Sequence, residues 1–132
     1  MRIARALADE IAQHAREDLP NECCGIVSTR GGDAVDVYRA RNAVPSPLRF
    51  EIDPRDLIRI HTDVEGRGLE MGSMYHSHVK SPAYPSQTDV NFAQNWPGVV
   101  WLIVSLADPD RPDLRGFRIN GSEVEEVPLR IG

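Results

Sequence analysis

The sequence predicts an α/β fold in which helices flank a single mixed sheet. Residues 2–18 have apolar side chains at helical spacing, and residues 53–66 begin with a helix cap. Residues 99–106 (VVWLIVSL) form a near-continuous apolar run, which is typical of a strand covered on both faces. Helices and strands do not alternate regularly, so we do not expect a repeated βαβ array.

The first third of the chain is expected to form a helix and a hairpin. Apolar residues recur every four positions in residues 2–18, and Pro20 ends that helix. Residues 24–29 and 34–39 are predicted strands on either side of the turn sequence RGGD. The apolar face of the helix is formed by Ile3, Leu7, Ile11 and Ala15.

The next segment, residues 41–53, contains two prolines, and we expect a short strand over residues 48–52 (LRFEI). A second helix should follow, with Asp53 as its N-cap and Pro54 at its first helical position. Glycines at positions 66 and 68 should end this helix.

The last half should alternate extended segments with one short helix. Residues 69–78 are expected to be extended, and a short helix should begin near Ser86. The strand over residues 99–106 comes next. The closing hairpin should turn at Asn120-Gly121.

Size and composition exclude several classes of protein. With 132 residues, we expect one domain over residues 1–132. The net charge of −5 disfavours non-specific nucleic-acid binding. No apolar run reaches the roughly 20 residues that a membrane span needs, and the N-terminus lacks the apolar core of a signal peptide. We therefore expect a cytoplasmic protein without nucleic-acid or membrane partners.

Two of the four histidines flank one serine in YHSHVKSPAYPSQTDV, residues 75–90. In an extended segment His76 and His78 point to the same side, where two imidazoles can bind one metal ion. A catalytic zinc site needs three protein ligands and an open position. Asp89 is the candidate third ligand, and two prolines stiffen the loop that leads to it.

These residues also have structural explanations. Ser86 and Asp89 fit a helix capping box, a role that requires no chemistry of Asp89 but is compatible with metal binding. His14 and His61 lie in predicted helices and are expected to serve in packing or at the surface.

The two cysteines, Cys23 and Cys24, are neighbours and no CxxC is present. We expect small buried residues at the start of a strand, although the spacing leaves zinc ligation by a thiolate open.

Amide hydrolysis at such a centre needs a carboxylate that takes a proton from water and passes it to the leaving amine. Asp89 is poorly suited because metal binding commits its oxygens. Spacing does not choose among the 20 acidic residues. Glu22 is attractive because it follows Pro20 at the entry to a predicted strand, although it also fits an exposed acid in a turn.

The pattern His76-Ser77-His78, seven residues, Ser86, two residues and Asp89 resembles the motif of the JAMM (MPN+) metalloproteases. In that motif an upstream glutamate precedes H-[ST]-H-x7-S-x2-D. The segments HAREDLPNECCGIV, FEIDPRD and WLIVSL are similar to bacterial members, so the resemblance covers nearly the whole chain.

This resemblance implies a cytidine-deaminase-like fold with a curved mixed sheet. It implies that His76, His78 and Asp89 bind zinc (Zn2+) with water as a fourth ligand. Glu22 would be the general base and acid, and Ser86 would donate a hydrogen bond to the developing oxyanion. Members of the family cut amide or isopeptide bonds after the Gly-Gly tail of ubiquitin or ubiquitin-like proteins.

The chain has no room for the two insertions by which eukaryotic members read ubiquitin chains. It resembles the minimal bacterial form, which implies a ubiquitin-like sulfur-carrier protein as partner and release of cysteine in cysteine biosynthesis. Residues 41–53 and the proline-rich loop would form the groove for the Gly-Gly tail. A homodimer is compatible with this interpretation.

Three alternatives remain. A deubiquitinase-like isopeptidase would use the same residues on a different leaving group. A zinc deaminase would need H-x-E and P-C-x-x-C signatures, and neither is present. A non-catalytic MPN scaffold would normally have lost metal ligands, whereas all three are present here.

Overall fold

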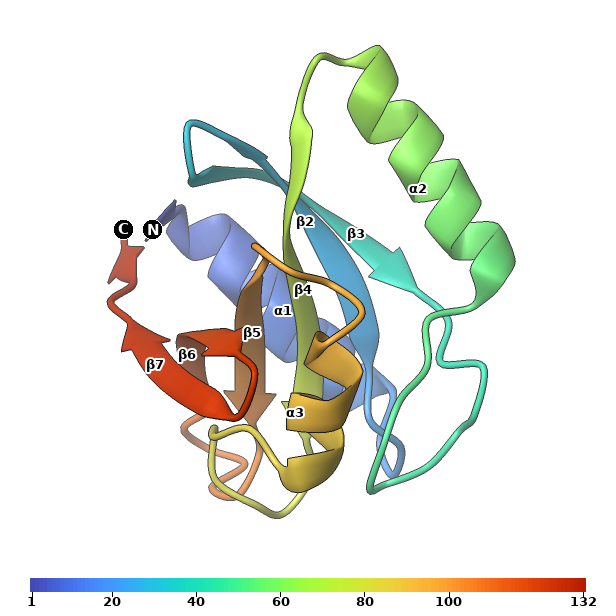
Figure 1. Ribbon diagram of the computed structural model, residues 1–132. Coiled ribbons are helices and arrows are strands. Elements are labelled where there is room, and N and C mark those ends of the chain that lie inside the picture. The colour runs from blue at the N-terminus through green and yellow to red at the C-terminus, as the bar shows by residue number, and fades with distance from the viewer.

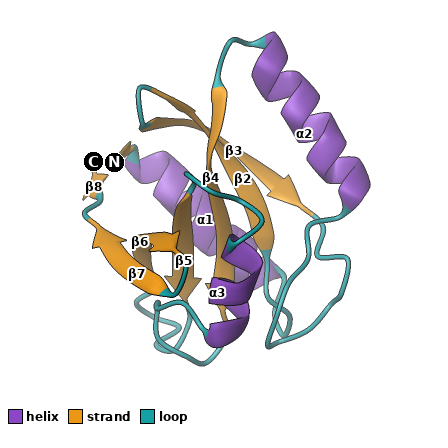
Figure 2. Cartoon of the chain, viewed as in Figure 1, coloured by secondary structure: helices purple, strands orange, loops and turns teal.

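A six-stranded mixed sheet in the order β3-β2-β4-β5-β6-β7 forms the centre of the fold (Figures 1 and 2). The computed structural model describes residues 1–132. Neighbouring strands are antiparallel except β4 and β5, which are parallel. The elements are β1 (Arg2–Ile3), α1 (Arg5–Glu17), β2 (Cys24–Arg30), β3 (Asp33–Ala40), α2 (Pro54–Gly66), β4 (Glu70–His78), α3 (Gln87–Ala93), β5 (Val100–Ser105), β6 (Asp113–Asn120), β7 (Glu123–Val127) and β8 (Arg130–Ile131).

Helices cover both faces of the sheet, so the predicted α/β class is confirmed. Helix α1 lies on one face, and α2 and α3 lie on the other (Figure 1). Alternate residues of the central strands therefore enter two separate apolar cores. Met74, Trp101 and Ile103 pack with Ile60, Val64 and Ala93 of α2 and α3, whereas Tyr75, Leu102 and Val104 pack with Ile11 and Ala15 of α1. No helix is both long and apolar enough to cross a membrane.

The predicted N-terminal helix begins three residues later than expected. Ala4 has an extended backbone, and Arg2 and Ile3 form β1, which pairs in parallel with β8. Ile3 is buried in the core beneath α1, so its apolar side chain serves a strand and not the helix. A pairing between the two ends of the chain leaves no local pattern in sequence.

The predicted short strand over residues 48–52 is wrong. Only an isolated bridge between Asn42 and Ile52 is present there. The Asn42 side chain satisfies backbone groups of this loop, including the amide of Glu51 and the carbonyl of Arg49. Two backbone bonds, from the amide of Ala43 to the carbonyl of Glu51 and from the amide of Asp53 to the carbonyl of Arg41, form the bridge. The Asn42 side chain takes further backbone groups of the loop, which therefore does not continue as a regular strand.

The other predicted elements are confirmed. Asp53 caps α2 by accepting from the amides of Arg55 and Asp56. All six residues of β5 are buried, as an apolar run covered on both faces requires. The final hairpin joins β6 to β7 through Gly121 and Ser122, one residue later than the predicted Asn120-Gly121, because Asn120 still pairs with Glu123. The φ of 60° at Gly121 suits a tight turn.

Candidate metal centre

His76 and His78 occupy the carboxyl end of β4, on the face covered by α2 and α3. The serine between them points to the opposite face. There, the Ser77 hydroxyl accepts the amide hydrogen of Cys23 at 2.8 Å, and the Ser77 amide donates to the Cys23 carbonyl at 3.2 Å. The middle residue of the motif therefore fixes the start of β2 beside the two imidazoles.

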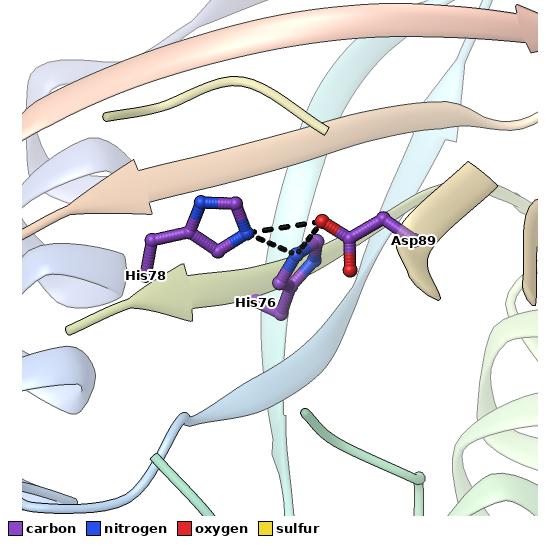
Figure 3. Close-up of side chains that lie close together, drawn as sticks. All are labelled: His76, His78 and Asp89. Carbon is purple, nitrogen blue, oxygen red and sulfur yellow. Dashed lines mark hydrogen bonds and ion pairs between the residues drawn. The ribbon is translucent and has the colours of Figure 1, made fainter. Parts of the chain in front are cut away.

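Asp89 comes from the first turn of α3, where the predicted capping box is present. The Ser86 hydroxyl accepts the amide of Asp89 at 3.1 Å, and the Ser86 amide donates to Asp89 Oδ2 at 3.0 Å. The same oxygen lies 3.1 Å from His76 Nε2 and 3.0 Å from His78 Nε2, and these two nitrogens are 3.2 Å apart (Figure 3). Capping thus positions Asp89 toward both histidines.

The tautomer of His78 places a hydrogen-bond acceptor, Nε2, inside this cluster. His78 Nδ1 lies 2.8 Å from the carbonyl of Pro82, which can only accept, so Nδ1 carries the hydrogen. The lone pair on Nε2 of the neutral ring then faces a carboxylate oxygen and a second imidazole nitrogen. A positive charge between these atoms, either a proton or a metal ion, removes the conflict.

The electrostatics of the cluster agree with this description. Burial opposes the charged form of His78, but hydrogen bonds to Asp89 and Pro82 outweigh it and raise the pKa of His78. Burial likewise opposes the charged form of Asp89, but the charge of His76 and hydrogen bonds from both histidines lower its pKa. The site therefore retains a carboxylate and favours a cation beside it.

The three potential ligand atoms suit a transition-metal ion. Two imidazole nitrogens and one carboxylate oxygen lie within 4.8 Å of one another, and all three residues are buried. Zinc binds such sets in catalytic sites and keeps a further position open. His78 makes the outer hydrogen bond that ligating histidines usually make. His76 Nδ1 has no protein acceptor, and the His76 ring is instead stacked against Phe50 at 4.5 Å between centroids.

Glu22 lies next to this cluster. It precedes β2, in which Cys24 pairs with His76 of β4, so Glu22 and His76 lie at the same end of these two neighbouring strands. Its side chain is buried, and Oε1 has no hydrogen-bond partner. Burial is the main cause that raises the pKa of Glu22 to about 8; within this net effect the charge of His78 lowers the pKa and that of Asp89 raises it. A carboxyl group in this environment is suited to exchange a proton near neutral pH.

Ser86 differs from these residues because it is exposed to solvent. Its hydroxyl oxygen accepts from the Asp89 amide, which leaves the hydroxyl hydrogen available to a ligand. The serine is thus placed beside the cluster by the same cap that positions Asp89.

The remaining histidines and the cysteines lie outside the cluster. His14 is buried and packs against Tyr75, and His61 is exposed near Glu65, as predicted for packing or surface residues. Cys23 and Cys24 are buried free thiols on opposite faces of β2, and burial raises the pKa of both. The residues that could share a metal ion include neither thiol.

A cavity of about 210 Å³ adjoins the cluster, between the loop that follows β3 and helix α3. The loop of residues 41–53 forms one wall of this cavity and α3 forms the other, whereas the predicted groove for the Gly-Gly tail combines that loop with the proline-rich loop. The cavity is lined by Val44, Arg49, Phe50, Glu51, Thr88, Asp89 and Phe92.

Sequence reasoning overlooked three residues near the centre: Asn42, Phe50 and Ser77. The alternation that aligns His76 with His78 already indicated that Ser77 faces away, toward the neighbouring strand. The contacts of Asn42 and Phe50 depend on how the loop of residues 43–51 folds, and no local sequence pattern predicted them.

The site thus consists of a His-x-His pair at the end of a central strand, with a capping aspartate and a buried glutamate beside it. The chain belongs to the prokaryotic homologs of the JAB domain, a family whose model matches residues 4–120.

Named relatives and a solved structure are similar to this chain over nearly its whole length. The chain is 33% identical over 127 residues to the CysO-cysteine peptidase of Mycobacterium tuberculosis, covering 95% of this chain and 86% of the relative. It is 36% identical over 139 residues to the desampylase of Haloferax volcanii, with 98% and 94% covered. A solution structure of a protein from Desulfitobacterium hafniense superposes with a TM-score of 0.90 at 34% identity, covering 100% of this chain and 93% of the other.

Proposed function

We propose that this protein is a zinc-dependent peptidase that hydrolyses the amide bond after the C-terminal Gly-Gly tail of a ubiquitin-like sulfur-carrier protein. The leaving group would be cysteine, released in cysteine biosynthesis. The observation that carries the proposal is the buried cluster of His76, His78 and Asp89 with Glu22 beside it. The similarity to a CysO-cysteine peptidase over 95% of the chain supports this substrate class.

His76, His78 and Asp89 would hold the zinc ion. When bound, zinc supplies Lewis acidity, which acidifies water and polarises the carbonyl of the scissile bond. Pro82 orients His78 through Nδ1, and the Ser86 amide orients Asp89 through Oδ2. These outer contacts keep the ligand atoms directed at one point.

Glu22 would move the proton. Its unpartnered Oε1 is free to accept a proton from the attacking water, and its raised pKa suits later donation to the leaving amine. Ser86 would donate its hydroxyl hydrogen to the oxygen of the tetrahedral intermediate. A base, an acid and an oxyanion donor are thus assigned to two residues that do not bind the metal.

The groove beside Asp89 suits a narrow extended chain. At about 210 Å³ and with aromatic walls from Phe50 and Phe92, it is small for a peptide with bulky side chains. Glycine residues let a backbone approach such walls closely. This supports a Gly-Gly tail as the segment that enters the site.

An isopeptidase acting on lysine-linked conjugates is the second candidate, because the relative from Haloferax volcanii is a desampylase. Both reactions use the same site and differ in the leaving group. A cytoplasmic location and a homodimer remain predictions from the sequence.

The test is to incubate the zinc-loaded protein with two versions of a Gly-Gly-tailed carrier. One version bears a single C-terminal cysteine, and the other is joined to a lysine side chain of a second protein. We expect the mass of the first to fall by one cysteine residue. Cleavage of the lysine-linked version alone would favour the isopeptidase, and cleavage of neither would refute the proposal.

Glu22→Gln separates catalysis from metal binding. Removing a general base costs about 10²–10⁴-fold in rate, so we expect cleavage to fall by that range. Metal content should stay near one zinc ion per chain, because Glu22 is not a proposed ligand. Near-normal turnover in this variant would show that another group is the base.

A further inference from the structure

Asn42 uses every hydrogen-bonding position of its side chain on the backbone around the site. Nδ2 donates to the carbonyl of Glu22 at 3.1 Å and to that of Arg49 at 3.2 Å. Oδ1 accepts from the amides of Val44 at 3.1 Å and Glu51 at 3.0 Å. An amide group has two donor hydrogens and two acceptor lone pairs, so the set is complete.

The environment fixes the orientation of this side chain. Asn42 is 7% exposed, and each end of its amide meets groups of the opposite kind. A flipped amide would place its oxygen against two carbonyls and its nitrogen against two amide hydrogens. Such an arrangement loses all four bonds in a buried place, so one orientation is selected.

The contacts of Asn42 join Glu22 to the loop of residues 43–51. The loop also holds Glu22 directly, because the Glu22 amide donates to the carbonyl of Ser46 at 2.8 Å. Both backbone polar groups of Glu22 are therefore bonded to this loop or to the residue that begins it. Phe50, near the other end of the loop, stacks on His76.

These backbone hydrogen bonds explain how the position of the Glu22 carboxyl group can be fixed. A carboxyl group that transfers protons needs a defined position, but Oε1 has no hydrogen-bond partner that would fix it. The backbone of Glu22 is instead held on both sides. Position is thus set without occupying the oxygen that would take the proton.

We propose that Asn42 is a positioning residue, which holds Glu22 and the loop 43–51 as one rigid unit beside the metal centre. The proposal rests on the proposed function, in which Glu22 is the base. The side-chain hydrogen bonds of Asn42 all go to backbone groups and none to a metal ligand, so its effect on cleavage passes through Glu22.

Two variants remove the hydrogen bonds of the Asn42 side chain to different extents. Asn42→Ala removes all four bonds. Asn42→Asp keeps the shape and the oxygen that accepts from Val44 and Glu51, but replaces the donor to Glu22 with a second oxygen. We expect kcat to fall at least about tenfold in both, but by no more than the roughly 10²–10⁴-fold that loss of the general base itself causes. Metal content should remain near one per chain.

A double-variant comparison distinguishes positioning from general weakening of the fold. Combined with Glu22→Gln, Asn42→Asp should slow cleavage no further, because no base remains to be positioned. Val64→Ala is the matched control: it weakens the core under α2, away from the site, and should lower the melting temperature with kcat unchanged.

Each outcome supports or overturns the positioning role of Asn42. Unchanged kcat in Asn42→Asp, or a loss that appears only in KM, would overturn the proposal. An equal further loss in the Glu22→Gln background would do so as well, since Asn42 would then act independently of the base. Cleavage of the cysteine-bearing carrier by the unaltered protein in the same series keeps these results separate from failure of the proposed function.

Discussion

Two buried histidine groups lie on opposite faces of the same sheet, and they differ in whether their polar atoms have complementary partners. On the face covered by α1, His14 Nδ1 lies 2.6 Å from the Tyr75 hydroxyl and Nε2 lies 3.3 Å from Asp18. A single neutral tautomer serves both, with Nε2 donating to the carboxylate and Nδ1 accepting from the hydroxyl. On the other face, Nδ1–H of His78 donates to Pro82, so the lone pair of His78 Nε2 faces the carboxylate oxygen of Asp89 at 3.0 Å, with His76 Nε2 3.2 Å away.

The contrast shows that burial of a histidine does not by itself indicate a metal site. His14 and His78 are both 4% exposed. Burial is the main influence on the pKa of His14 and lowers it, so the neutral ring is preferred. The partners of His78 reverse the effect of burial and raise its pKa. The distinguishing property is the demand for a positive charge.

The largest expected effect comes from replacing one histidine on each face of the sheet, His78 or His14, with alanine. His78→Ala should lower metal content well below one per chain and abolish cleavage, because it removes a proposed ligand. His14→Ala should retain the metal and lose only stability. Bound zinc at 100 times its Kd stabilises a protein by about 2.7 kcal/mol, so added zinc should raise the melting temperature of His14→Ala but not of His78→Ala.

Metal analysis of both purified variants, together with melting curves with and without zinc, provides the measurement. Full occupancy in His78→Ala would remove this residue from the proposed ligands. Loss of metal from His14→Ala would show that the two faces are coupled, and the contrast would fail.

Ser86→Ala should have an intermediate effect. Loss of an oxyanion donor lowers kcat by about 10²–10³-fold, and we expect the lower end because Ser86 is exposed. The variant also removes a helix cap, which costs about 1 kcal/mol of stability. Kinetics and a melting curve on the same sample separate the two effects.

The cap of α2 offers the matched control for Ser86. Asp53→Ala removes a cap of the same kind from a helix that supplies none of the proposed site residues. It should lower the melting temperature by a similar amount with kcat unchanged. A proportionate loss of kcat in both variants would assign the role of Ser86 to capping alone.

Much of the candidate site could be predicted because its parts obey local rules. The period of a strand aligned His76 with His78, and the capping box placed Asp89 at the start of α3. Glu22 was one acid among 20 by spacing, and only the family resemblance selected it. The roles of these residues in binding and catalysis stay predictions.

The parts that the sequence did not reveal depend on contacts between distant segments. The pairing of β1 with β8 joins the two ends of the chain. The loop after β3 was predicted to contain a strand because its composition suits one, yet only an isolated bridge forms there and the side chain of Asn42 satisfies other backbone groups of the loop. A single polar residue that organises a loop has no periodicity to detect.

The smallest expected effect concerns the pH dependence of stability on the α1 face. The pKa of His14 is lowered from its ordinary value of about 6.5. As the pH falls below 6.5, the unfolded state therefore binds more protons at position 14 than the folded state does. The contribution of His14 to the free energy of unfolding is complete above pH 6.5 and is lost as the pH falls through the pKa of the folded state. The slope is at most about 1.4 kcal/mol per pH unit for one group.

Urea denaturation of the metal-free protein and of His14→Gln, between pH 7 and pH 5, measures this contribution. The metal-free state is used so that release of an ion does not add to the pH dependence, and titration of His78 then affects both proteins alike. The stability advantage of histidine over glutamine at position 14 should shrink as the pH falls. A constant or growing advantage would mean that His14 is not held neutral, and the distinction between a satisfied and an unsatisfied histidine group would lose its electrostatic basis.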